Sequence, residues 1–166
     1  MHYAISRSVA VAHWPTQTPS SSRAFSLPEL MLALAVAGVL AMIAFPAYSE
    51  YRERARVSQA VADIAEMQVQ IERFQTLNFR LPNTLTEAGL GALVDPWNRT
   101  YVFVNYAVDG VSGRRQDKNM NPINTEYDLY SKGKDGLTQK QLDHSRSLDD
   151  VVRATDGSYI GLASKF

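Results

Sequence analysis

The sequence predicts an α+β fold, with a long N-terminal α-helix packed on a small antiparallel β-sheet and a long C-terminal loop region. Residues 30–45 are all apolar or Gly, and apolar residues at steps of three and four follow between residues 57 and 74. Beyond residue 78, aromatic and β-branched segments are separated by Gly, Pro and Asn. These patterns are typical of a helix followed by strands. The 166 residues fit one modest domain plus an anchor.

Residues 1–24 are interpreted as a leader. They contain the basic residues Arg7 and Arg23 and no acid, and the apolar stretch follows them. By the positive-inside rule, the leader stays in the cytoplasm and the rest of the chain is exported. A conventional secretory signal is cut after its apolar stretch, next to small residues, and residues 45–48 fit that pattern poorly. An uncleaved anchor, or a signal cut after Ala44, is the alternative.

One helix is predicted over residues 25–78. Residues 25–48 form the transmembrane half, since roughly 20 apolar residues cross a bilayer. Residues 49–78 form an amphipathic half that packs on the globular region. Its apolar stripe comprises Val57, Val61, Ile64, Met67, Ile71 and Phe74. Pro46 should bend the helix, because Pro removes one backbone hydrogen bond.

Glu29 is the single charged residue near the start of the apolar segment. A carboxylate inside a membrane is costly unless it finds a partner, and such residues are functional candidates. The alternative is a structural acid that reaches toward the lipid interface.

The globular region is predicted over residues 79–166. Residues 101–106 and 127–131 are expected to pair as strands, and residues 158–163 are a candidate third strand. Residues 109–124 are expected to form an exposed loop. The basic residues of that loop, Arg114, Arg115 and Lys118, are interpreted as solvated.

Residues 24–29, Ala-Phe-Ser-Leu-Pro-Glu, lead directly into the apolar stretch, and they resemble the cleavage motif of the type IV prepilin family. The resemblance implies that a prepilin peptidase cuts between Ala24 and Phe25 and that the new N-terminus of Phe25 is methylated. It also implies that Glu29 and Phe25 serve assembly, with the cation of one subunit paired with the acid of its neighbour.

Two further segments narrow the resemblance. Asp95-Pro96-Trp97 and residues 127–136, YDLYSKGKDG, are similar to the major pseudopilins of type II secretion. This implies a single-pass protein of the bacterial inner membrane with a periplasmic globular region. It also implies self-association into a filament, with other pseudopilins or pilins and inner-membrane assembly proteins as partners. Two alternatives remain: a type IV pilus or minor-pilin subunit, and a membrane-anchored monomeric calcium- or ligand-binding domain.

The same resemblance implies a calcium site in the loop of residues 131–150, with Asp135, Asp149 and Asp150 as carboxylate ligands. Calcium takes six to eight oxygens, and carboxylates combined with backbone carbonyls can supply them. The residue spacing is not that of an EF-hand, so solvated loop acids are the alternative.

Composition and motifs exclude several other functions. The chain has no Cys, so disulfides and thiolate metal sites are absent. Its formal net charge is zero and becomes −2 without the leader, which holds two Arg and no acid. No nucleic-acid partner is therefore expected. His144 lies between Asp143 and Ser145, but no nucleophile elbow accompanies them, and the chain is predicted not to be an enzyme.

Overall fold

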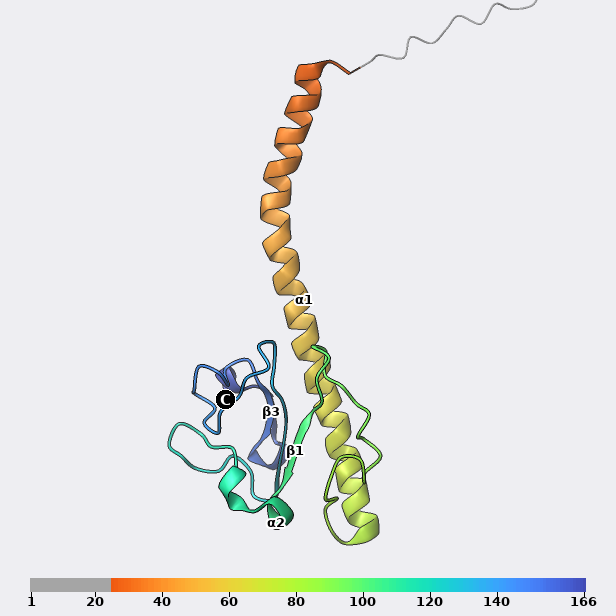
Figure 1. Cartoon of the computed structure of the whole chain (residues 1–166), viewed down its shortest axis with the longest axis vertical. Coiled ribbons are helices and arrows are strands. Elements are labelled where there is room, and N and C mark those ends of the chain that lie inside the picture. The colour runs from red at the N-terminus through yellow and green to blue at the C-terminus, as the bar shows by residue number, and fades with distance from the viewer. Residues whose placement is uncertain (1–24) are drawn as a thin grey trace, which may run out of the picture. The chain divides into compact units, whose positions relative to one another are not determined.

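The computed structural model describes residues 25–166, so the predicted leader, residues 1–24, lies outside the described residues. The chain divides into two compact units, with the boundary between Met42 and Ile43. The long helix predicted from the sequence is confirmed as α1, Leu27–Asn78, drawn from orange to yellow-green in Figure 1. Its bounds differ from the predicted ones by no more than two residues.

The part of α1 that lies in the first unit is apolar and exposed. Leu30, Val36 and Leu40 each expose more than half of their surface. Among the described residues, α1 is the helix that is long and apolar enough to cross a membrane, and none of its most apolar window is buried within the chain. A side-chain surface of this kind requires lipid or neighbouring subunits. By length and composition, this stretch could anchor the chain in a membrane as a single span.

In the second unit, α1 buries the centre of the stripe that the sequence predicts. Ile64, Met67 and Ile71 are fully buried, as is Ala60, which the predicted stripe did not include. Val57, Val61 and Phe74 are only partly buried. The four fully buried residues pack in one core with Leu129 and Val151 of the sheet and with two Tyr side chains, Tyr101 and Tyr127. This core fixes the amphipathic half of α1 on the sheet, because three- and four-residue steps place these side chains on one helix face.

The sheet has four antiparallel strands in the order β1-β2-β3-β4. Their bounds are β1 Val102–Asn105, β2 Tyr127–Ser131, β3 Val151–Ala154 and β4 Tyr159–Leu162. Figure 1 shows β1 and β3 beside the C-terminal half of α1. The register pairs Phe103 with Leu129, Ser131 with Val151, and Val151 with Leu162. The predicted strands at 101–106, 127–131 and 158–163 are confirmed.

The sequence did not predict β3. All four residues of this strand are buried, including Arg153, so its sequence VVRA lacks the apolar and polar alternation of a half-exposed strand. The Arg153 guanidinium lies 4.0 Å from the centre of the Tyr127 ring, and its Nε donates to Oε1 of Gln68 on α1. A charged residue in a buried strand is uncommon unless it is paired.

The opposite face of the sheet is covered by loops. Tyr130 and Val152 point away from α1 and pack in a second core with Ile123, Leu142, Ala154 and Ala163. The sequence predicted an exposed loop at residues 109–124, but part of this segment is buried against the sheet. Arg115 is only 2% exposed, and its interpretation as a solvated residue was wrong.

Candidate functional site

The two residues predicted to serve assembly lie at the N-terminal end of the described chain, Phe25 just before α1 and Glu29 within it. The backbone N–H of Leu30 donates to the carbonyl oxygen of Ser26 at 3.1 Å, so Ser26 holds the N-cap position and Glu29 the first helical turn. Pro28 also lies in this turn, where a missing N–H has no intrahelical acceptor to lose. An acid is electrostatically favoured at this helix end.

Glu29 is exposed among apolar side chains. Phe25 exposes 76% of its surface, and Leu30, Ala33 and Val36 lie on the same face of the segment. The structure therefore places Phe25 and Glu29 near each other on an exposed apolar surface, which lipid or neighbouring subunits would have to cover. Ala24, the other residue of the predicted cleavage site, lies outside the described residues.

The Asp95-Pro96-Trp97 turn is hydrogen-bonded to the end of β2. Oδ1 of the buried Asp95 accepts from the backbone N–H groups of Trp97, at 3.0 Å, and Arg99, at 2.8 Å. Oδ2 of Asp95 accepts from the Ser131 hydroxyl, and the Ser131 oxygen in turn accepts from the Gly133 N–H at 3.1 Å. Hydrogen bonds thus join the Asp95-Pro96-Trp97 turn to residues 127–136, the two segments that resemble the major pseudopilins. The sequence alone does not show this contact.

The indole of Trp97 anchors this turn to the helix. Its Nε1 donates to Oε1 of Glu53 on α1 at 3.0 Å, and the Trp97 side chain is only partly buried. Trp97 also packs against the core between α1 and the sheet. The hydrogen bond fixes the turn against the amphipathic half of α1.

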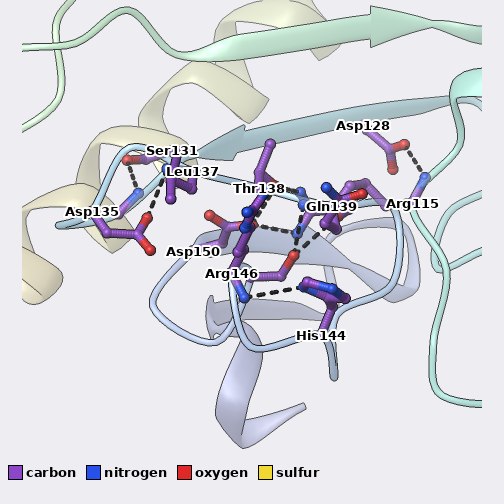
Figure 2. Close-up of polar contacts among 12 residues, drawn as sticks. Arg115, Asp128, Ser131, Asp135, Leu137, Thr138, Gln139, His144, Arg146 and Asp150 are labelled. Atoms are coloured by element: carbon purple, nitrogen blue, oxygen red, sulfur yellow. Dashed lines mark hydrogen bonds and ion pairs between the residues drawn. The ribbon is translucent and has the colours of Figure 1, made fainter.

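Two of the three predicted calcium ligands lie together. The Asp135 N–H donates to Oδ2 of Asp149 at 2.9 Å, and Oδ1 of Asp135 accepts from the Leu137 N–H at 2.7 Å. Figure 2 shows Asp135 in the turn that follows Ser131. Both carboxylates thus cap backbone N–H groups of the loop.

Asp150 has different partners. Its Oδ2 lies 2.6 Å from Nη2 of Arg115 and accepts a hydrogen bond from the Thr138 hydroxyl at 2.6 Å (Figure 2). Burial raises the pKa of Asp150 to about 6, although the charge of Arg115 and the hydrogen bond from Thr138 oppose the rise. The other carboxylate oxygen, Oδ1, is buried without a hydrogen-bond partner.

The carboxylates of this loop are oxygen ligands of the kind that calcium prefers, but Asp135, Asp149 and Asp150 each accept a hydrogen bond from the protein. Within residues 25–166, no three His, Asp or Glu side chains gather where they could hold a metal ion. Sequence reasoning missed Arg99, Arg115 and Thr138, which bind the acceptors of the loop. No local pattern distinguishes Arg115 from the neighbouring Arg114, so only the tertiary structure identifies it.

His144 belongs to a turn of the same loop. Its Nδ1 accepts from the Arg146 N–H at 3.2 Å (Figure 2). The Ser147 hydroxyl donates to the Gln139 carbonyl at 3.0 Å. Both contacts are local and stabilise the loop backbone.

Two family models match consecutive parts of the chain. The prokaryotic N-terminal methylation motif matches residues 19–45, and the type II secretion system protein G family matches residues 47–146. The first match contains the predicted cleavage site and Glu29. The second contains the amphipathic helix, β1, β2 and most of the loop that follows β2.

Curated relatives agree with these matches. The type II secretion system core protein G of Dickeya chrysanthemi is 35% identical over 114 residues, which cover 69% of this chain and 71% of that protein. Core protein G of Pectobacterium carotovorum subsp. carotovorum is 32% identical over 120 residues, covering 72% and 74%. A fimbrial protein of Neisseria meningitidis serogroup A is 27% identical over 142 residues, covering 80% and 84%. No solved structure matches the chain.

The resemblance drawn from the cleavage motif and the Asp95 turn is therefore confirmed. The protein G model covers more than half of the chain, directly after the methylation motif. This chain belongs to the type II secretion system protein G family and is a pseudopilin subunit.

Proposed function

We propose that this subunit polymerises through α1 into a periplasmic filament that serves type II protein secretion. The observation that carries the proposal is the exposed apolar surface around Glu29, in a chain of the protein G family. Assembled neighbours would cover that surface. The family is structural, and we propose no enzymatic role.

The pairing of Glu29 with a neighbour's N-terminus would give the filament its register. Cleavage between Ala24 and Phe25 creates an amine at Phe25, four residues before Glu29. A subunit displaced by one helical turn would leave an acid and an amine unpaired among apolar side chains. Breaking such a pair costs about 3–5 kcal/mol when it is buried.

The inner membrane and the periplasm are the proposed location. Arg7 and Arg23 precede the apolar segment, and by the positive-inside rule they keep the N-terminal side in the cytoplasm. The partners would be a prepilin peptidase, other pseudopilins and the assembly proteins of the inner membrane.

Cleavage between Ala24 and Phe25 is expected to leave a mature chain that begins with N-methylated Phe25. The motif is on the cytoplasmic side of the apolar segment, where a membrane peptidase would reach it. The intact mass of the protein, extracted from membranes of cells with an active prepilin peptidase, measures this directly. A mature chain that begins after Ala44, or one that keeps its leader, would contradict the prediction.

Deletion of the gene in its native bacterium should stop type II-dependent export of proteins into the medium, and the intact gene supplied on a plasmid should restore it. The alternative is a type IV pilus subunit, favoured by the similarity to the fimbrial protein of Neisseria meningitidis. Normal export combined with the loss of surface pili would support this alternative. Measuring exported protein and sheared pili from the same cultures separates the two functions.

A further inference from the structure

The loop predicted to bind calcium has a buried guanidinium at one of its carboxylates. Arg115 and Asp150 form an ion pair of 2.6 Å, and their side chains are 3% and 0% exposed. The Thr138 hydroxyl accepts from Nη1 of Arg115 and donates to Oδ2 of Asp150. Figure 2 shows these three side chains converging beneath the strand that leads into the loop.

A second guanidinium binds the backbone carbonyls of the same loop. Nη1 of Arg99 donates to the carbonyl oxygen of Gly133 at 2.5 Å, and Nη2 donates to that of Lys134 at 3.1 Å. The carbonyl oxygen of Lys132 accepts from the Gly136 N–H at 3.2 Å. All three of these carbonyls therefore already have hydrogen-bond donors from the protein.

Hydrogen bonds with Asp95 fix the backbone position of Arg99. Its backbone N–H donates to Oδ1 of Asp95, and its carbonyl oxygen accepts from the Asp95 N–H at 2.7 Å. The guanidinium thus extends from a closed turn, and the same turn reaches the end of β2 through Ser131.

The carboxylates of residues 25–166 do not gather in threes at any point where they could hold a metal ion. Calcium requires six to eight oxygens. Among the described atoms of residues 132–150, Oδ1 of Asp150 is the buried side-chain oxygen that lacks a partner. Asp135 and Asp149 accept from backbone N–H groups. In charge, however, two guanidinium groups equal one calcium ion.

We propose that Arg99 and Arg115 together take the place of a calcium ion, so that residues 132–150 are ordered without metal. Arg115 balances the charge of the buried Asp150 carboxylate. Arg99 donates hydrogen bonds to the carbonyl oxygens of Gly133 and Lys134 and so holds the turn together. A guanidinium presents five donors in a fixed plane, which allows each Arg to join two acceptors. This inference replaces the metal expected from the family resemblance and does not depend on the proposed role in secretion.

The first test measures thermal unfolding of the full chain in detergent, with calcium chloride or with the chelator EGTA. We expect the same melting temperature in both. A site filled at a hundredfold excess of calcium over Kd would raise the melting temperature by about 5 °C or more. A rise of that size in the unmutated chain would overturn the proposal and restore the calcium prediction for Asp135, Asp149 and Asp150.

The second test removes the guanidinium charge of Arg115. R115Q should lower the melting temperature by about 10 °C in both calcium and EGTA, because Asp150 then lacks its buried partner. Limited proteolysis should cut within residues 132–150 of this variant. K118Q is the matched control, since it removes one charge from an exposed position in the same segment and should unfold like the unmutated chain.

A double variant distinguishes charge pairing from a general effect on packing. R115Q/D150N removes the unpaired carboxylate as well, so it should recover part of the melting temperature that R115Q loses. An unchanged melting temperature in R115Q, or a double variant no more stable than R115Q, would overturn the pairing of Arg115 with Asp150.

Discussion

Replacement of Glu29 by Val is expected to leave the chain in the membrane but to prevent its incorporation into filaments. Valine makes the first turn of α1 more apolar, so insertion should be unchanged or improved. The neighbour's N-terminal amine, however, loses its carboxylate partner inside an apolar bundle. The expected cost of about 3–5 kcal/mol per subunit interface corresponds to a reduction in assembly of roughly 100-fold or more.

The measurement compares the filament yield in sheared fractions with the amount of subunit in membranes. Glu50→Ala is a matched control, because Glu50 is an exposed acid of the same helix whose pairing with Arg54 at 3.5 Å is also exposed. Such pairs contribute little to stability. The control should assemble normally, whereas normal filament yield from Glu29→Val would rule out the pairing of Glu29 with Phe25.

Periodicity was sufficient to predict α1 and the strands with strong β patterns. The buried positions Ile64, Met67 and Ile71 follow from three- and four-residue steps, which require no knowledge of the rest of the chain. The aromatic and β-branched residues of β1 and β2 are similarly local signals. β3 lacked such a signal, because a strand buried on both faces has no alternation and this one contains Arg153.

The partners of the loop predicted to bind calcium could not be identified from local sequence patterns. The sequence identifies Asp135, Asp149 and Asp150 as oxygen donors but cannot show which cation reaches them. Arg115 is 35 residues before Asp150 and becomes buried only because its segment covers the second core. Both guanidinium groups lie over aromatic rings, Arg115 over Tyr130 and the adjacent Arg114 over Tyr106. Arg114, however, is only partly buried and has no carboxylate partner like Asp150 among the described residues. Two neighbouring residues of one type thus acquire different roles through tertiary packing.

The turn at Gly133 is expected to be the part of the loop most sensitive to substitution. Gly133 has φ +60°, and a Cβ there would overlap the backbone carbonyl of Asp149. A backbone carbonyl cannot turn aside as a flexible side chain does. Gly133→Ala should therefore lower the free energy of unfolding by at least about 3 kcal/mol, as a sum of backbone strain and overpacking.

Gly89→Ala separates these two effects. Gly89 has φ +77°, but a Cβ at that position would meet nothing within 4 Å. Its substitution should cost only the strain of a left-handed backbone, about 1–2 kcal/mol. Urea denaturation of both variants gives the difference, provided that the slope with denaturant stays constant. Equal losses in the two variants would show that Asp149 does not pack against Gly133 as the structure places it. A larger loss at Gly133 would confirm that this close approach holds Asp149 against the turn that contains Asp135.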